Sequence, residues 1–445
     1  MKSFEIGVRT ATALNRTSYS ASYLAAIMAV SLASAGEPVP AEADSPPVTL
    51  TTDAVVAQVV ERNPELDFYR AEIAAARAGR RISGQWHNPE LSAELGNKRV
   101  WDRGGATLGD GVAWSVSVAQ TFEFPGRIAL RKAIANRQVE LAEVGLAHFQ
   151  ASLAARARGK ALAALAAQQQ TEAAEEVSRR FRSLLETLVQ RDPAGITPLL
   201  DQRIIEASSI TIERRAAQAA RELQGALLEL NQLRSAPAAA PFRLSGSLEM
   251  PTNAPPLSAL LEAAATNNFD LRLRQTELAQ QGFHVELARN ERYPNVTLAP
   301  FYAAETANDE QRIVGVGISL PLPLWHQNRG GVEAAQAREQ QAQASLRATQ
   351  REVERRVTDH ALALETRLAE MAQWRPDATA QFREAAELAD RHFRLGAVPV
   401  TIYVEMQMKY LDALEALLAT RREALEHRQQ LELLVGMPLE AVPGR

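Results

Sequence analysis

Residues 126–190 read GRIALRKAIANRQVELAEVGLAHFQASLAARARGKALAALAAQQQTEAAEEVSRRFRSLLETLVQ. No proline interrupts this stretch, and its only internal glycines are Gly145 and Gly159. Ala, Leu, Glu, Gln and Arg fill most of it, and these are strong helix formers. At 1.5 Å per residue, a continuous helix over this range is about 95 Å long, which is longer than a globular domain can bury. The stretch therefore predicts a rod, and the rest of the chain can be organised around it.

A second run of similar length and composition covers residues 330–394, and we expect a second continuous rod there. The surrounding elements repeat as well: a helix, two alternating strands, the long helix, a turn and a shorter helix occur in that order twice. The two copies are offset by about 200–206 residues throughout, which indicates an internal duplication. The expected helices are 51–81, 126–190 and 197–234 in the first copy and 257–290, 330–394 and 400–435 in the second.

These patterns divide the chain into five segments. Residues 1–35 resemble a secretory signal, with basic residues, a short apolar core at 23–32 and the small residues Ala33, Ser34 and Ala35 before the expected cleavage. A transmembrane anchor is the alternative, but about ten apolar residues cannot span a ~30 Å hydrocarbon core. The remaining segments are a first repeat (36–236), a linker (237–256), a second repeat (257–436) and a C-terminal tail (437–445).

Composition excludes several classes of function. The chain has 445 residues, a net charge of −4 and 5% aromatic residues, so it carries no basic surface signal for nucleic acid. It contains no cysteine, which rules out disulfides, thiolate metal sites and a cysteine nucleophile. It also lacks the acceptor for N-terminal lipidation, so we expect any membrane attachment to depend on the strands.

The strand pairs alternate between apolar and small or polar residues, which is typical of strands with two different faces. We predict that Trp114, Val116, Val118 and Val316 face lipid, whereas Ser115, Ser117 and Gly317 face a lumen. The expected lengths of about 9–11 residues suit strands that cross a bilayer at a tilt. A soluble cap made of two hairpins is the alternative, because the strand signal is weak.

Four amphipathic strands cannot close a barrel, and an open edge is not tolerated in lipid. Three chains would supply twelve strands and a closed ring. The expected fold class is mainly α with a small membrane β part: a duplicated long-helix α-barrel, with four strands per chain in a trimeric twelve-stranded β-barrel. A fibrous coiled coil is less consistent with the sequence, since the long helices are rich in alanine and lack sustained heptads.

The whole mature chain resembles the TolC family of outer-membrane efflux proteins. Four segments of this chain are most similar to the cobalt–zinc–cadmium (CzcC-like) branch of that family: NPELDFYRAEIAAARA, HNPELSAEL, QTFEFPGRIALRKAIAN and RLGAVPVTIYVE. The resemblance implies a homotrimer in the outer membrane of a Gram-negative bacterium that extends into the periplasm. It also implies a periplasmic adaptor (membrane fusion) protein, a proton-driven RND-type inner-membrane pump, and heavy-metal cations as cargo. A duct for drugs or other small molecules remains open.

The resemblance also suggests a periplasmic gate. Glu405 lies after Gly396 at a position that carries a pore carboxylate in the family, Asp201 follows Gly195 in the first repeat, and Phe393 matches an aromatic gate residue. The expected tip turns, which would contact the adaptor, contain Asp192, Gly195, Gly396 and Pro399. The alternative for Glu405 is a solvated helix residue outside the tube.

No motif for catalysis, a cofactor or a metal is found, so the chain is not expected to be an enzyme. The seven histidines are dispersed along the sequence without metal-ligand spacing, and each is expected to be an ordinary surface or interface residue. Two hypotheses remain: a passive export duct, and a periplasmic structural coiled-coil or adaptor protein. The paired strands favour the duct.

Overall fold

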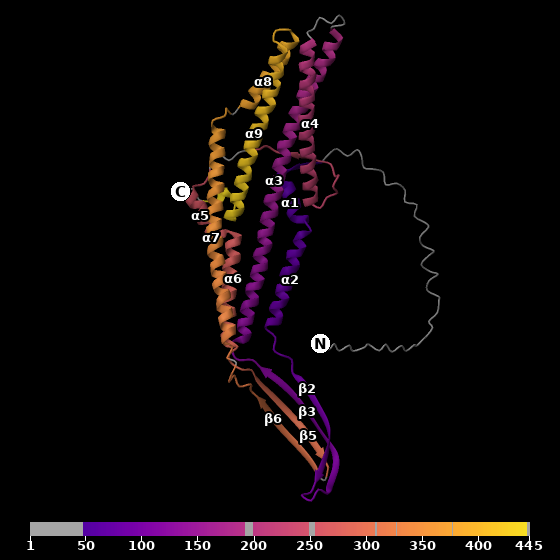
Figure 1. Ribbon diagram of the computed structural model, residues 1–445, viewed down its shortest axis with the longest axis vertical. Coiled ribbons are helices and arrows are strands. Elements are labelled where there is room, and N and C mark those ends of the chain that lie inside the picture. The colour runs from indigo at the N-terminus through magenta and orange to yellow at the C-terminus, as the bar shows by residue number, and fades with distance from the viewer. Residues whose placement is uncertain are drawn as a thin grey trace, which may run out of the picture. The chain divides into compact units, whose positions relative to one another are not determined.

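The computed structural model describes residues 48–191, 199–248, 254–307, 309–325, 327–375 and 377–442. The expected signal segment, residues 1–35, lies outside them. All described residues belong to a single unit, which starts at Val48. Within it, Figure 1 shows the long helices running alongside one another and the four longer strands lying side by side.

The two halves of this unit share one order of elements, namely two helices, two strands, a long helical segment and a shorter helix, but they differ in strands β1 and β4 and in the division of the second long segment into two helices. The first half has β1 (Val48–Thr51), α1 (Thr52–Arg62), α2 (Glu65–Ser83), β2 (Glu90–Trp101), β3 (Thr107–Phe122), α3 (Arg127–Arg191), α4 (Leu199–Leu233) and β4 (Phe242–Ser245). The second half has α5 (Leu257–Asn267), α6 (Phe269–Asn290), β5 (Val296–Thr306), β6 (Glu310–Ser319), α7 (Arg329–Ala372), α8 (Ala378–Arg394) and α9 (Val400–Val435), followed by a short 3₁₀ turn at Leu439–Ala441.

The first predicted rod is present as α3, one helix of 65 residues. It packs against α1, α2, α4, α6 and α9. Small side chains line its buried seam, among them Ala157, Ala161 and Ala164, which are completely buried. Alanine lets neighbouring backbones approach closely and adds no side-chain entropy cost, so the same residues favour both the helix and its packing.

The expectation of a second continuous rod over residues 330–394 is wrong. Helix α7 ends at Ala372 and α8 begins at Ala378. Pro376 lies within this run of sequence. Proline has no backbone N–H to donate and disfavours helical geometry in the residue before it, so a helix normally ends ahead of it.

The helices that precede the strands are also interrupted, at equivalent places. Residues 51–81 form α1 and α2 with Asn63 between them, and residues 257–290 form α5 and α6 with Asn268 between them. Each asparagine Oδ1 accepts from the backbone N–H of the following helix, at Glu65 (2.9 Å) and Leu271 (3.0 Å). Each break is therefore a capped joint between two helices.

The Nδ2 groups of the same two asparagines reach the ends of the shorter helices. Asn63 Nδ2 donates to the Leu233 carbonyl at 3.1 Å, and Asn268 Nδ2 donates to the Leu434 carbonyl at 2.7 Å. Carbonyls in the last turn of a helix have no partner within the helix, so these bonds satisfy them. The joint thus holds α4 next to α1–α2 and α9 next to α5–α6, in the same way in both halves.

The predicted linker, residues 237–256, contains strand β4. It pairs in parallel with β1, from Val48 opposite Phe242 to Thr51 opposite Ser245. Phe242 and Leu244 are buried against the helices, and the guanidinium of Arg234 lies 4.3 Å from the Phe242 ring centroid. Four residues are too few to show a period in the sequence, so tertiary pairing decides this element.

Candidate functional site

Strands β2, β3, β5 and β6 form one antiparallel sheet in that order, so the two hairpins join through β3 and β5. The loops within the two hairpins are short: β2 ends at Trp101 and β3 begins at Thr107, while β5 ends at Thr306 and β6 begins at Glu310. Residues that are paired across antiparallel strands project to the same face. The register therefore assigns every side chain of the sheet to one of two faces.

One face is apolar from the first strand to the last. Val116 pairs with Ala93 on one side and Tyr302 on the other, and Tyr302 pairs with Val314. The residues of this face, here called the apolar face, include Leu91, Ala93, Leu95, Trp114, Val116, Val118, Leu298, Pro300, Tyr302, Val314, Val316 and Ile318. The pairing register aligns the apolar residues of the four strands, so that together they form one continuous surface.

The four residues predicted to face lipid all lie on the apolar face. Trp114, Val116, Val118 and Val316 are 42%, 37%, 43% and 64% exposed in the single chain. Leu95 on the neighbouring strand is 81% exposed. A surface of this size and composition, left open on a water-soluble protein, is unusual and normally marks contact with lipid or another protein.

The opposite face is mostly polar or small, with Phe301 and Ile313 as its large apolar residues. It holds Ser115, Ser117 and Gly317, as predicted from the alternation. Lys98 Nζ contacts Glu305 Oε2 at 2.5 Å across β2 and β5, and Ser115 Oγ donates to Glu94 Oε2 at 3.2 Å. Charged side chains are stable in contact with water and costly to place in an apolar environment. This face therefore suits contact with water, whereas the apolar face does not.

Aromatic and charged groups lie at opposite ends of the sheet. At the end next to the helices, Trp86 meets Phe122 edge to face at 5.6 Å, and Phe124 stacks on Tyr293 at 4.3 Å. Near the loops, Arg99 pairs with Asp110 and Arg312 pairs with Glu310. An apolar band bordered by aromatic rings and charges is the arrangement of strands at a membrane boundary.

The sheet has two open edges. Within the described residues, β2 pairs only with β3 and β6 pairs only with β5. An edge strand presents unpaired N–H and C=O groups, and inside hydrocarbon each of these would cost several kcal/mol. The sheet is therefore incomplete as a membrane element in one copy of the chain.

The other predicted site lies near the turn between α8 and α9. Gly396 adopts φ 75°, a left-handed conformation that ends α8, and Pro399 immediately precedes α9. The other two tip residues, Asp192 and Gly195, lie outside the described residues. Both Glu405 on α9 and Asp201 on α4 follow within two turns of the beginning of their helices, the first exposed and the second half-buried.

Phe393, the third residue predicted to belong to the gate, is partly buried against other rings of the chain. Its ring stacks on Tyr403 at 5.1 Å, and Phe181 of α3 lies 5.2 Å from the same tyrosine ring. Tyr403 is fully buried, and burial together with the nearby charge of Asp390 raises its pKa well above the usual value. The three rings fix the position of α9 relative to α3 and α8.

A network of four charged residues connects α3 to α8 behind these rings. Arg180 Nη2 lies 2.6 Å from Glu176 and 3.4 Å from Glu387, while Arg383 lies 3.2 Å from each of the same carboxylates. The completely buried Gln407 of α9 donates to the Ala386 carbonyl at 2.7 Å. Sequence analysis missed this network, because its members are about 200 residues apart.

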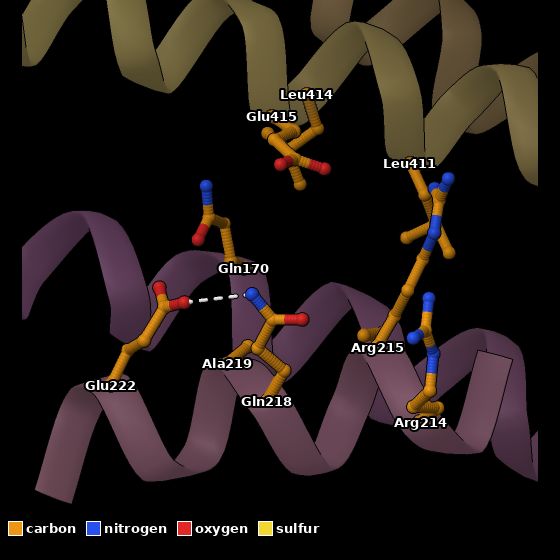
Figure 2. A pocket seen from close by; sticks show the side chains of 10 residues that line it. Gln170, Arg214, Arg215, Gln218, Ala219, Glu222, Leu411, Leu414 and Glu415 are labelled. Atoms are coloured by element: carbon orange, nitrogen blue, oxygen red, sulfur yellow. Dashed lines mark hydrogen bonds between the residues drawn. The ribbon is translucent and has the colours of Figure 1, made fainter. Parts of the chain in front are cut away.

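A polar pocket of about 190 Å³ lies next to this region, between α3, α4 and α9 (Figure 2). Figure 2 shows Arg214, Arg215 and Glu222 of α4 in its wall, with Glu415 of α9 opposite. Arg215 is paired with Asp412 at 2.7 Å, and Gln218 donates to Glu222 at 3.0 Å. Arg215 and Glu222 thus already have partners, and the lining carries charges of both signs, so we interpret the pocket as a hydrated seam between helices and not as a cofactor site.

The histidines are less dispersed than the sequence suggests. His360 of α7 and His427 of α9 have their Nδ1 atoms 3.1 Å apart. His87 lies 3.1 Å from the buried carboxylate of Glu123, and His148 stacks on Phe269. Among the described residues, no cluster of three or more His, Cys, Asp or Glu side chains is arranged to hold a metal ion. His326 lies outside those residues.

None of the described helices is both long and apolar enough to span a membrane.

Residues 260–437 match the family model described as outer membrane efflux protein. A search among curated proteins found no match.

Solved structures match almost the whole chain. A membrane protein from Pseudomonas aeruginosa superposes with a TM-score of 0.70 at 18% identity, covering 88% of this chain and 91% of its own. CusC gives 0.68 at 15% identity, with 88% and 93% covered. The Campylobacter jejuni outer membrane channel CmeC gives 0.68 at 14% identity, with 86% and 85% covered. The described chain therefore has the fold of outer-membrane channels, and its second half carries the sequence pattern of the outer membrane efflux protein family.

Proposed function

We propose that this protein is the outer-membrane exit duct of a tripartite, proton-driven efflux system. The observation that carries the proposal is the sheet: a continuous apolar face, a polar opposite face, and two open edges. Its strands have 12, 16, 11 and 10 residues, and a membrane-crossing strand needs about 9–11. Such a sheet suits lipid on one side and water on the other, but only when its edges are paired.

Trimerisation would pair those edges. We propose that β6 of one copy lies beside β2 of the next, so that three copies close a twelve-stranded barrel with the apolar face outward. Closure of a barrel removes all edges, which is the requirement for strands in lipid. Ser115, Ser117 and Gly317 would then line the lumen, and the α-barrel would continue the passage into the periplasm of a Gram-negative cell.

The duct performs no chemistry in this proposal, so its partners must supply energy and cargo. We propose that the helix tips, with Asp192, Gly195, Gly396 and Pro399, contact a periplasmic adaptor, which connects them to an RND-type pump in the inner membrane. Heavy-metal cations are the proposed cargo, supported by the resemblance of residues 63–78 and 394–405 to the cobalt–zinc–cadmium branch. A duct for drugs or other small molecules would use the same architecture.

We further propose that Glu405 and Asp201 form the periplasmic gate. With threefold symmetry each carboxylate occurs three times, and like charges that crowd a narrow mouth favour cations. Phe393 would contribute by holding α9, which carries Glu405, through its stack on Tyr403. The network of Arg180, Glu176, Arg383 and Glu387 would hold α8 against α3 in the same state.

Two measurements test the proposal. Native purification from outer-membrane fractions should yield a trimer whose migration on gels changes with heating. Recovery of a soluble periplasmic monomer would contradict the duct and support the structural coiled-coil alternative. In planar bilayers, Glu405→Gln combined with Asp201→Asn should reduce cation preference and block by divalent ions. Glu415→Gln, which changes a carboxylate further along α9, serves as the control. Unchanged conductance and selectivity in the double variant would remove both carboxylates from the gate.

A further inference from the structure

His360 and His427 are brought together by the fold from positions 67 residues apart. His360 belongs to α7 and His427 to α9, and both side chains are half-buried where these helices pack. Their ring centroids are 5.3 Å apart, with the ring planes inclined by 48°. The two Nδ1 atoms face each other at 3.1 Å.

This arrangement favours neutral rings over charged ones. Two imidazolium ions would both present an N–H at the contact and would repel each other. Burial lowers the pKa of His360, and the charges of His427 and Arg356 lower it further, while Asp359 acts in the opposite direction. Between neutral rings, one Nδ1–H donates to the other Nδ1. When the donor ring carries its proton on Nε2 instead, both Nδ1 atoms offer a lone pair, which is the form of histidine that binds metals.

The spacing of the two nitrogens matches that of a metal site. Nitrogen ligands lie about 2.0–2.1 Å from Zn²⁺, so two of them in a tetrahedral site are about 3.3 Å apart. The observed separation of 3.1 Å differs from this by only ~0.2 Å, a change that a small rotation of the rings would supply. Half-burial leaves the outer side of the pair open to water, which can complete the coordination.

The neighbouring charges are largely occupied elsewhere. Arg355 of α7 is paired with Glu352 at 2.7 Å and with Asp359 at 2.5 Å. Glu423, one turn before His427 on α9, is paired with Arg367 at 2.8 Å. Arg356 remains as a nearby positive charge that opposes a cation. The site therefore depends on its two imidazoles and not on a surplus of acidic groups.

From this geometry we propose that His360 and His427 form a binding site for one divalent transition-metal cation, which links α7 to α9. Imidazole nitrogen suits Zn²⁺, Cu²⁺, Ni²⁺ and Co²⁺, whereas Mg²⁺ and Ca²⁺ prefer oxygen. The site does not depend on the cargo of the duct or on its gate. A bound cation would hold together the two helices that enclose the core around Val357, Leu364 and Leu431.

The first test uses the unsubstituted full-length protein, purified in detergent and freed of metal. One equivalent of Cu²⁺ is added, and electron paramagnetic resonance counts the equatorial imidazole nitrogens. Two nitrogens on a single class of site are expected. A spectrum with one nitrogen or none, or several classes of site at one equivalent, would overturn the proposal.

The second test assigns the nitrogens. His360→Gln and His427→Gln should each weaken Zn²⁺ binding at least about tenfold and reduce the nitrogen count to one. His148→Gln and His392→Gln, which remove histidines elsewhere, should leave both values unchanged. Circular dichroism and trimer migration check that the Gln variants are folded. Unchanged Zn²⁺ affinity in a folded His360→Gln/His427→Gln double variant would mean that the metal binds elsewhere.

Discussion

Helix α3 and its counterpart in the second half, α7 with α8, differ in continuity although they stand at the same place in the repeat. Helix α3 is unbroken over 65 residues, whereas α7 and α8 are separated at residues 373–377. α3 packs against five other helices, while α8 packs chiefly against α9. A break is tolerated in the copy with fewer neighbours, where a change of direction disturbs less packing.

The break has a local consequence. A largely apolar cavity of about 390 Å³ lies beside it, lined by Trp374, Phe382, Leu417 and other residues of α8 and α9. Helix α8 is nevertheless held to α3 by Arg383 and Glu387, which pair with Glu176 and Arg180. In the second half, the break between α7 and α8 thus lies beside a cavity, and ion pairs hold α8 to α3 between this break and the turn at Gly396. The order of the elements is the same in both halves, while the continuity of the long helix differs.

The largest expected effect comes from copying the break into α3. Glu175 and Pro376 each lie 20 residues before the glycines of the two predicted tip turns, Gly195 and Gly396. Glu175 is exposed, so Glu175→Pro changes mainly the backbone and should cost about 3 kcal/mol or more. We expect a lower unfolding midpoint by circular dichroism and loss of trimers. Glu175→Ala is the control, and equal stability of the two variants would show that continuity of α3 is not required.

The strands should behave alike in the two halves. Val116→Arg and Val316→Arg each place a charge on the apolar face and should each cost about 2–4 kcal/mol if that face meets the middle of the bilayer. Ser117→Arg, on the opposite face, should cost far less. Folding into lipid vesicles, followed by gel mobility before and after heating, measures this difference. Equal assembly of Val116→Arg and Ser117→Arg would refute the proposed orientation of the sheet.

The asparagine joints should also be equivalent. Asn63→Ala and Asn268→Ala each remove a helix cap and leave a helix-end carbonyl without its partner, so each should cost about 1–3 kcal/mol. Denaturant unfolding of the two variants gives the comparison directly. Asn→Asp at either position keeps the cap but loses the Nδ2 donor, and should therefore not restore stability. A large difference between the two alanine variants would show that the joints have diverged as the long helices have.

The smallest effect concerns pH and is confined to the second half. The pKa of His360 is lowered from 6.5 in the folded state, so the unfolded chain binds more protons at this position as the pH falls. Its contribution to stability is present above pH 6.5 and is lost as the pH falls through the folded-state pKa. The denaturant concentration at the unfolding midpoint of the metal-free protein should decrease as the pH is lowered below 6.5. The decrease should be less steep in His360→Gln. If the midpoint depended on pH equally steeply in the unsubstituted protein and in His360→Gln, the proposed contribution of His360 would be wrong.

Local patterns in the sequence were sufficient for much of the architecture. Helix propensity and the lack of proline predicted α3 to within one residue at each end. Period-2 alternation placed Trp114, Val116 and Val118 on one face and Ser115 and Ser117 on the other, as the register shows. The turn around Gly396 and Pro399 was recognised from its residue types alone. These features depend on interactions between residues that are close in sequence, which a sequence pattern records.

Other features depended on distant contacts, and sequence patterns did not reveal them. Strand β4 exists because β1 provides backbone partners, and four residues carry no period of their own. His360 meets His427, and Arg180 meets Glu387, because α7, α8 and α3 pack beside helices that are remote in sequence. The break before α8 is of a different kind, since Pro376 is a local signal that stands in the sequence itself. The sequence by itself determined the elements and their faces through local sterics and hydrophobic periodicity, whereas tertiary packing decided which faces and which side chains meet.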